Sequence, residues 1–393
     1  MNLISEIQKQ LAKNGIDGWL LYDFQGLNPI AKRLLNLKSA LLTRRWYCWI
    51  PQAGEPKILC HQIEQASFDA LKLRMVVFKN WKEMLQRLED ILTGAENVAM
   101  EYSAFCSIPY VAKVDSGTIE TIRGLGKNIV SSADLIQFFQ SRWSEEQLQM
   151  HLHTSDLLMQ ILFETFERIG SGLARGERLT EYTVQQDILQ KFVAHRLTTS
   201  APPIVAIGRN TANPHYEPSP VRAETVRRGD LLLIDLWAKL EQPASVYADY
   251  TWVAYLGDSV PGEIVEAWNI VRGARDAALD FVRSNYLQGM PIQGWQVDSV
   301  ARTYIADRGF GEMFIHRTGH NIGEDDHGTG ANLDNLETKD ERQLIADTCF
   351  SIEPGIYLAD FGVRSEVNVV LKASEIIVTG NPIQKEIHLI RAH

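Results

Sequence analysis

The chain has 393 residues, of which 45% are hydrophobic and 22% are charged, a composition typical of a folded globular protein. Since this length exceeds what one ordinary hydrophobic core serves, two domains are expected. The formal net charge is −10 and no basic stretch offsets it, which argues against a nucleic-acid partner.

The cysteines and the apolar segments bear on the compartment. Four cysteines are scattered without a Cys-x-x-Cys pair, which is typical of a reducing compartment and gives no sign of a disulfide framework. No basic segment followed by an apolar run marks a secretory signal, and no apolar run approaches the ~18 residues of a membrane span. The sequence therefore predicts a cytoplasmic protein without a membrane partner.

The first part of the chain alternates between predicted helices and strands. Strands are predicted at residues 19–22, 46–50, 57–60, 76–78 and 98–100. The turn-rich segment 51–56 suggests a hairpin, and a helix is predicted over 81–92. Such alternation predicts a layered α/β domain that ends near residue 140.

A long amphipathic helix is expected to begin the second part. Ser144 and Gln147 form a capping-box pattern, and apolar residues recur behind them at helical spacing as far as Gly170, where the helix is expected to end. His151 and His153 lie on this helix and are expected to be surface or core-edge side chains. The predicted domains are therefore residues 1–140 and 141–393.

The second part mixes further helices and strands. Helices are predicted over residues 181–195, 261–284 and 295–308, and strands over 204–207, 231–237, 246–256, 349–358 and 364–371. Together with the first part, this order predicts a fold of the α/β (α+β) class.

Five residues of the second part have the types and order of a two-metal hydrolase site: Asp235, Asp249, His320, Glu353 and Glu366. Four carboxylates and one imidazole suit a pair of Mn²⁺, Co²⁺ or Zn²⁺ ions better than a structural zinc ion, which would favour thiolates. Two divalent ions roughly 3.5–4 Å apart can share a hydroxide and polarise a carbonyl group. Four acids on adjoining strands would repel one another strongly without cations.

Each of these residues also has a simpler explanation when it is taken alone. Asp235 could be a buried aspartate that caps a loop, Asp249 a turn residue, and His320 a hydrogen-bonded core histidine. A single Glu-Pro-Gly, such as the one at Glu353, is only a turn. The metal hypothesis depends on all five occurring in one order with apolar flanks.

The motifs around these residues are Thr-Gly-His320, Glu353-Pro-Gly and Arg364-x-Glu366, and with them the chain resembles the pita-bread metallopeptidases, peptidase family M24. This family includes methionine aminopeptidase, Xaa-Pro aminopeptidase and Xaa-Pro dipeptidase (prolidase). The resemblance covers about the last 250 residues. It implies a C-terminal pita-bread catalytic domain over 141–393, preceded over 1–140 by an N-terminal α/β domain similar to that of creatinase and prolidase.

The resemblance also implies roles for the five residues. Asp235 would bind one metal alone, Asp249 and Glu366 would bridge both ions, and His320 and Glu353 would complete the shell of the other. Glu353 is in addition expected to be the general base, with a pure ligand role as the competing interpretation. The implied cofactor is two divalent metal ions, with Mn²⁺ favoured over Co²⁺ and Zn²⁺.

Further residues match family positions near the substrate. The resemblance implies that His215, His316 and His327 contact the substrate or transition state, that Arg364 pairs with carboxylates near the site, and that Tyr357 lies near the metals. For each, the alternative is a supporting or packing role. Trp237, Trp252 and Arg317 depart from the family pattern, so we expect them to reshape the substrate pocket.

The function implied by this resemblance is a two-metal exopeptidase that cuts Xaa-Pro bonds. Its expected partner is a small peptide with proline at the second position, and a homodimer is expected. Proline fixes φ and its nitrogen lacks a hydrogen, so general peptidases handle this bond poorly. The sequence leaves open dipeptidase against aminopeptidase, a metal-free creatinase-like hydrolase of small amidines or amides, and a non-catalytic binding module.

Overall fold

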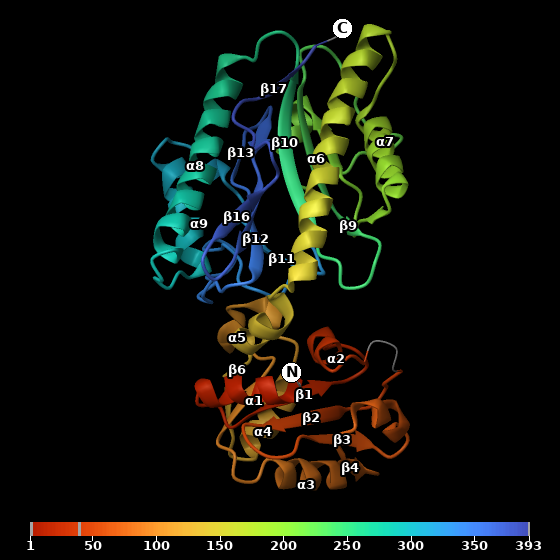
Figure 1. The fold of residues 1–393 in the computed structure, drawn as a ribbon, viewed down its shortest axis with the longest axis vertical. Helices are drawn as coiled ribbons and strands as arrows, with labels where there is room; N and C mark the ends of the chain where they lie inside the picture. The colour runs from red at the N-terminus through yellow and green to blue at the C-terminus, as the bar shows by residue number, and fades with distance from the viewer. Residues whose placement is uncertain (1–2, 38–40, 392–393) are drawn as a thin grey trace. The chain divides into compact units, whose positions relative to one another are not determined.

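The computed structural model describes residues 3–37 and 41–391, and the chain divides into two compact units, Met1–Gln140 and Ser141–His393 (Figure 1). The fold is mixed α/β, as the sequence predicts. Among the described residues, no helix is long and apolar enough to cross a membrane.

The first unit is built on a six-stranded mixed sheet with the strand order β4-β3-β2-β1-β5-β6. Its strands are β1 (Gly18–Asp23), β2 (Trp46–Pro51), β3 (Lys57–His61), β4 (Arg74–Phe78), β5 (Asn97–Met100) and β6 (Asn128–Ser131). Its α-helices are α1 (Leu3–Lys13), α2 (Pro29–Leu34), α3 (Trp81–Ile91), α4 (Ser116–Gly124) and α5 (Ala133–Ile136). The predicted hairpin is confirmed, because β2 and β3 pair antiparallel.

Strand β1 shows why this sheet is covered on both faces. Successive side chains of a strand point to opposite faces, and all six residues of β1 are buried. Trp19 and Leu21 belong to one hydrophobic cluster, whereas Leu20 and Tyr22 belong to another. The first unit therefore has two apolar layers with the sheet between them.

The second unit carries the predicted site and contains two larger sheets. One has the order β17-β10-β9-β7, with β8 also paired to β9, and the other has the order β11-β12-β15-β16. The strands are β7 (Leu197–Thr198), β8 (Ile204–Ile207), β9 (Leu231–Leu240), β10 (Ala248–Leu256), β11 (Asn321–Ile322), β12 (Thr348–Ile352), β13 (Gly355–Tyr357), β14 (Gly362–Arg364), β15 (Val367–Leu371), β16 (Ile376–Thr379) and β17 (His388–Ile390).

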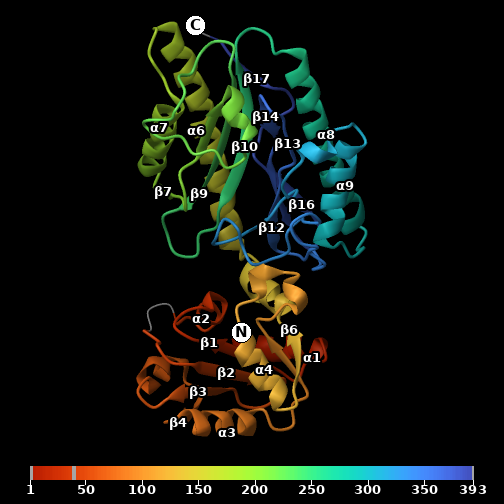
Figure 2. The same cartoon turned by 180° about the vertical axis from the view of Figure 1, so that it is seen from behind.

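Two pairs of helices cover the outer faces of these sheets (Figures 1 and 2). They are α6 (Glu145–Ala174) with α7 (Glu181–Ala194), and α8 (Gly262–Tyr286) with α9 (Gly294–Ala306). Helix α6 packs on β9 and β10, and α8 packs against β12, β13 and β14. Each pair of helices therefore covers one face of the strands on which it packs.

Helix α6 begins as predicted but ends later. The Ser144 side chain and the Gln147 side chain form the capping box. The predicted end at Gly170 was wrong, because the helix continues to Ala174. A glycine inside a helix costs only about 1 kcal/mol, and a side chain at 170 would put its Cβ 2.8 Å from the carbonyl oxygen of Arg391. Gly170 therefore permits close packing against Ile390 and Arg391.

The expectation for His151 was also wrong. This side chain is fully buried, with Nδ1 2.8 Å from the carbonyl oxygen of Tyr247 and Nε2 2.8 Å from Oγ1 of Thr379. His153, two residues further along α6, is exposed. The helix therefore fixes one histidine as an internal hydrogen-bonding group between sheets.

Candidate active site

The first two acids lie on neighbouring antiparallel strands. Asp235 is on β9 and Asp249 on β10, and the register pairs Asp235 with Thr251 and Asp249 with Trp237. The alternate residues of both strands, such as Ile234 and Tyr250, belong to the apolar cluster under α6. Because side chains alternate across a strand, the two acids face the opposite, interior side, where both are buried.

The other two acids lie where a second strand pair is interrupted. The predicted strands 349–358 and 364–371 are each broken, since β12 pairs with β15 and β13 pairs with β14. Glu353 follows the last paired residue of β12, and Glu366 precedes the first paired residue of β15. The ladder therefore stops at the positions of both glutamates.

His320 is held in place by groups on both sides of it. A Cβ at Gly319 would lie 2.0 Å from the carbonyl oxygen of Ser351, so only glycine permits this approach. The backbone N–H of His320 donates to Oγ of Ser351 at 3.0 Å. Its Nδ1 lies 3.1 Å from the carbonyl oxygen of Asp326 and 3.3 Å from that of Asn321.

These contacts decide which nitrogen of His320 is free to bind a metal. Carbonyl oxygens only accept hydrogen bonds, so Nδ1 carries the proton and Nε2 keeps a lone pair. Burial lowers the pKa of His320 well below its usual value, and the ring is therefore neutral at pH 7. Nε2 points toward carboxylate oxygens, at 3.4 Å from Oδ2 of Asp249 and 3.3 Å from Oε1 of Glu353.

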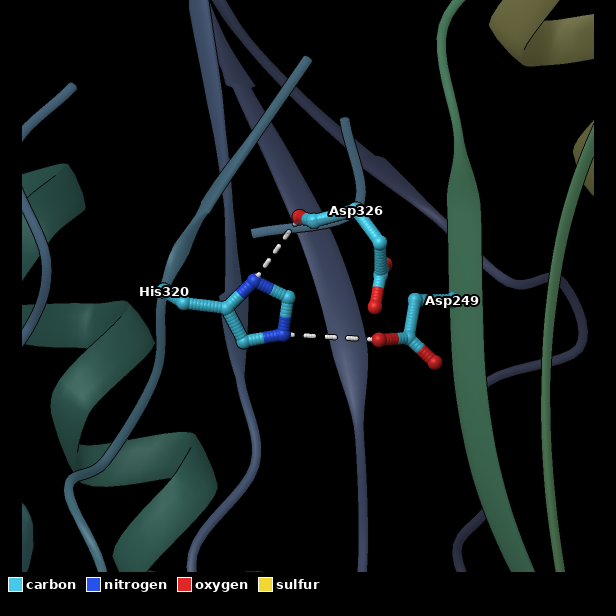
Figure 3. A group of neighbouring side chains, drawn as sticks. All are labelled: Asp249, His320 and Asp326. Atoms are coloured by element: carbon cyan, nitrogen blue, oxygen red, sulfur yellow. Dashed lines mark hydrogen bonds and ion pairs between the residues drawn. The ribbon is translucent and has the colours of Figure 1, made fainter. Parts of the chain in front are cut away.

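The structure brings all five predicted side chains together. Potential ligand atoms lie within 4.8 Å of one another in two sets that share Glu366: Asp235, Asp249 and Glu366, and His320, Glu353 and Glu366. A third set within the same distance contains Asp249, His320 and Asp326 (Figure 3). The residues thus converge from β9, β10, the His320 segment and the broken strand pair.

The donor atoms of this cluster fit divalent cations. Among the described residues, Oδ1 of Asp249 and Oε1 of Glu366 are buried and have no hydrogen-bond partner. Burial, together with the charges of neighbouring acids, raises the pKa of both carboxyl groups well above the usual range. Unpaired buried carboxylate oxygens carry a high desolvation cost, and a bound cation would offset that cost.

The pKa of Glu353 is raised to about 7 by burial, while the charge of Arg364 opposes this rise. Its Oε1 accepts a hydrogen bond from Oγ of Ser351 at 3.1 Å. A carboxyl group with a pKa near neutrality can both accept and release a proton under physiological conditions. Glu353 is therefore suited to general base chemistry as well as to ligation.

Arg364 orients one of the acids through a set of hydrogen bonds. Its Nη2 donates to the carboxylate of Asp235, and its Nε donates to Oγ1 of Thr251 at 2.8 Å. The Thr251 hydroxyl in turn lies 3.0 Å from carboxylate oxygens of Asp235 and Glu366. This arginine lies beside the acids, as the resemblance implied, and it fixes the geometry of Asp235.

The same arginine continues into a second chain of contacts. Nη1 of Arg364 donates to the hydroxyl of Tyr357 at 3.1 Å, and that hydroxyl lies 2.8 Å from Nε2 of His316. Nδ1 of His316 lies 2.7 Å from the carbonyl oxygen of Arg317. Because this carbonyl accepts the Nδ1 proton, Nε2 of His316 accepts from Tyr357. Both ring nitrogens are engaged, which favours a positioning role for His316.

His327 and His215 are more open to solvent. The His327 ring lies edge-on to the His320 ring, with centroids 4.3 Å apart, and its side chain is 62% exposed. His215 is exposed, and its backbone N–H donates to Oδ1 of Asn213. Among the described residues, no hydrogen bond or ion pair joins the His215 ring to the five site residues. His327 is thus the accessible imidazole beside the cluster.

Of the three residues that depart from the family pattern, two lie beside the site and one does not. Trp252 lies on the α6 face of β10 and packs against Phe163, with ring centroids 5.1 Å apart, so its expected effect on the pocket was wrong. It is three residues from Asp249 and therefore on the opposite face. Trp237 lies directly across from Asp249, and buried Arg317 influences the pKa of Glu353. These two remain adjacent to the site.

Several residues around the site were not found from the sequence. Asn368 brackets the backbone of Asp249, donating from Nδ2 to its carbonyl oxygen at 2.7 Å and accepting its N–H at 3.0 Å. This contact ties β15 to β10. Thr251 and Ser351 hold carboxylates, and Asp326 adds a fifth acid. The one signal in the sequence is that Asp326 directly precedes His327, which the resemblance places near the substrate.

Comparison with known proteins fits this arrangement. The model of Metallopeptidase family M24 matches residues 155–373, which is more than half of the chain. The chain belongs to this family. The predicted resemblance is therefore confirmed, and the matched range includes all five predicted site residues.

Individual relatives and structures agree with the family assignment. The chain is 36% identical over 202 residues to the Xaa-Pro dipeptidase of Lactobacillus delbrueckii subsp. lactis, a match that covers 51% of this chain and 49% of that protein. The chain spans about half the length of the curated relatives it matches.

Solved structures share the fold over nearly the whole chain. Dipeptidase PepE from Mycobacterium ulcerans superposes with a TM-score of 0.73 at 23% identity, covering 99% of this chain and 97% of that one. The prolidase from Thermococcus sibiricus gives 0.66 at 22% identity and covers 99% of each chain. The expected pita-bread fold is therefore confirmed.

Proposed function

We propose that this protein is a two-metal exopeptidase that hydrolyses Xaa-Pro bonds, either as a dipeptidase or as an aminopeptidase. The observation that carries the proposal is the pair of ligand sets that share Glu366, with unpartnered buried oxygens on Asp249 and Glu366. The names of relatives, among them Xaa-Pro dipeptidase and prolidase, support proline as the second residue of the substrate.

The ligand sets suggest how two cations would be held. Asp235, Asp249 and Glu366 would hold one, and His320, Glu353 and Glu366 would hold the other, with Asp249 also near His320. Oxygen-rich ligation favours Mn²⁺, while Co²⁺ and Zn²⁺ suit the same residues. When bound, the cations would supply Lewis-acid polarisation of the scissile carbonyl and would acidify a water molecule.

The protein's own residues would then move the proton. In this proposal an oxygen of Glu353 accepts the proton of the attacking water and delivers it to the leaving proline nitrogen, which has no hydrogen of its own. The hydrogen bond from Ser351 holds Oε1 of Glu353. Arg364 keeps Asp235 in place. The hydrogen bonds from Arg364 to Tyr357 and from Tyr357 to His316 hold these three side chains in fixed positions beside the acids.

The exposed histidines would contact the substrate. We infer that His327, whose ring lies next to that of His320, contacts the peptide, and that His215 also contacts it. The first unit would be the creatinase-like and prolidase-like N-terminal domain, and the second the catalytic domain. The homodimer and the cytoplasmic location remain predictions, which light scattering and cell fractionation would test.

Metal content and peptide cleavage test the proposal together. The full-length protein is stripped with chelator, reloaded with Mn²⁺, Co²⁺ or Zn²⁺, and assayed with Xaa-Pro, Xaa-Pro-Xaa and matched Xaa-Ala peptides. We expect cleavage of proline peptides only after reloading, and a loss of at least about 100-fold in Glu353→Gln. Glu337→Gln, an exposed glutamate in the same unit, is the matched control and should behave as wild type.

The outcomes separate the competing functions. If the proline peptides remain uncleaved after the protein has been reloaded with each of the three metals, the proposal is refuted. Hydrolysis of small amidines by protein that carries no metal would favour the creatinase-like alternative. Bound metal without any hydrolysis would favour a binding module, and the length series would distinguish a dipeptidase from an aminopeptidase.

A further inference from the structure

Asp326 lies in the segment between β11 and β12, where it faces the site. Its carboxylate points into the space between the His320 ring and the carboxylate of Asp249 (Figure 3). One carboxylate oxygen of Asp326, one carboxylate oxygen of Asp249 and a ring nitrogen of His320 all lie within 4.8 Å of one another. The side chain is 14% exposed. Its Oδ1 has no hydrogen-bond partner among the described residues.

The adjoining backbone fixes where this carboxylate can go. The carbonyl oxygen of Asp326 accepts the Nδ1 proton of His320 at 3.1 Å, so one residue both orients the imidazole and presents its carboxylate to the same space. The segment is tied on both sides, because Gly323 accepts from the N–H of Tyr247 at 2.9 Å and Gly328 donates to Asn321 at 2.8 Å. Asp326 is therefore part of a fixed arrangement.

A second observation points to a cation between these groups. The Asp249 side chain is 8% exposed, and its Oδ1 also lacks a hydrogen-bond partner. Oδ2 of Asp249 lies 3.4 Å from Nε2 of His320. The carboxylates of Asp249 and Asp326 would repel each other beside this neutral imidazole, and burying them without a counter-charge is costly. A divalent cation placed among the three groups would be bound by one oxygen of each carboxylate and by the lone pair of His320.

We propose that Asp326 is a sixth protein ligand, which supplies an additional carboxylate to a cation held by His320 and Asp249. This inference rests on the proposed two-metal function. It assigns to this chain a ligand beyond the five found from the sequence. The Arg317 charge close to Asp326 and Glu353 gives a reason for an additional carboxylate, since that arginine would otherwise disfavour a cation there.

Metal binding, measured apart from activity, tests this inference. Chelated full-length protein is titrated with Mn²⁺ by calorimetry, and free Mn²⁺ is counted by electron paramagnetic resonance. We expect wild type to bind two ions, and Asp326→Asn and Asp326→Ala to weaken one of them by about tenfold or more. Asp325→Asn, the exposed neighbour in the same segment, is the matched control and should bind both ions as wild type does.

The results distinguish failure of this inference from failure of the proposed function. Two tightly bound ions in wild type and unchanged binding in both Asp326 variants would overturn the role of Asp326 and leave the two-metal function standing. Wild type that binds no Mn²⁺, Co²⁺ or Zn²⁺ would overturn both. The near-ultraviolet circular dichroism spectrum of each variant, compared with wild type, establishes that the weakened binding occurs in folded protein.

Discussion

Burial of His151 predicts how the stability of the second unit depends on pH. Burial lowers the pKa of this imidazole to about 4 in the folded protein, from an ordinary value of 6.5. Between these pH values His151 is protonated in the unfolded chain and neutral in the folded chain. The contribution of His151 is therefore complete above pH 6.5 and is lost as the pH falls toward 4. The difference between the two pKa values corresponds to about 3 kcal/mol in the free energy of unfolding, of which about 2 kcal/mol is lost by pH 5.

His151→Gln removes the titrating group while it keeps an amide donor and acceptor for Tyr247 and Thr379. At pH 7.5 we expect the variant to be less stable than wild type by about 1–3 kcal/mol, because its hydrogen bonds are poorer. On going to pH 5, wild type should lose about 2 kcal/mol more than the variant. Urea unfolding of chelated protein, followed by tryptophan fluorescence at several pH values, measures this difference.

The exposed His153 on the same helix provides the control. His153→Gln should leave both the stability and its pH dependence within about 0.5 kcal/mol of wild type. If wild type and His151→Gln lose the same free energy of unfolding between pH 7.5 and pH 5, the argument from burial is refuted. A common loss in all three proteins would instead be due to other groups, such as the carboxylates of the site.

Three further substitutions probe other features. Arg364→Lys cannot make all three hydrogen bonds of the guanidinium, so we expect kcat to fall about 100-fold with KM little changed; an unaltered kcat would contradict its positioning role. Gly319→Ala would clash with the carbonyl of Ser351 and should cost about 1–3 kcal/mol in urea unfolding; full stability would show that this contact can relax. Burial raises the pKa of Glu101 to about 7, so its contribution is present below pH 4.5 and lost as the pH rises through 7. Between pH 5 and pH 8 the free energy of unfolding of wild type should therefore decline by about 2.5 kcal/mol more than that of Glu101→Gln. Equal declines would refute this assignment.

The metal-ligand candidates could be predicted because four acids and one histidine, with apolar strand residues beside them, already indicate a metal site. Asp235 and Asp249 interrupt apolar strands, and a buried acid in such a position needs a reason. The helix start at Ser144 was equally accessible, since a capping box is a local pattern. Strand parity also places Trp252 on the opposite face from Asp249, which lies three residues earlier.

The rest depended on contacts between distant segments. Gly170 reads as a helix end in the sequence, and only the approach of Arg391 explains its place inside α6. The Pro354-Gly355 pair is a local signal for the interruption at Glu353, but the pairing of β12 with β15 and of β13 with β14 depends on contacts between separate segments. Asp326 was missed because its role follows from the position of the His320 ring, which the chain sets through hydrogen bonds rather than through spacing.

The division of the ligands between two strand pairs has a consequence during synthesis. Asp235 and Asp249 leave the ribosome well before Glu366, and β17, which pairs with the Asp249 strand, comes later still. The candidate ligands on β9 and β10 therefore lack Glu353 and Glu366 until the second strand pair has been synthesised. A cation that needs all of them would bind only after that pair has folded.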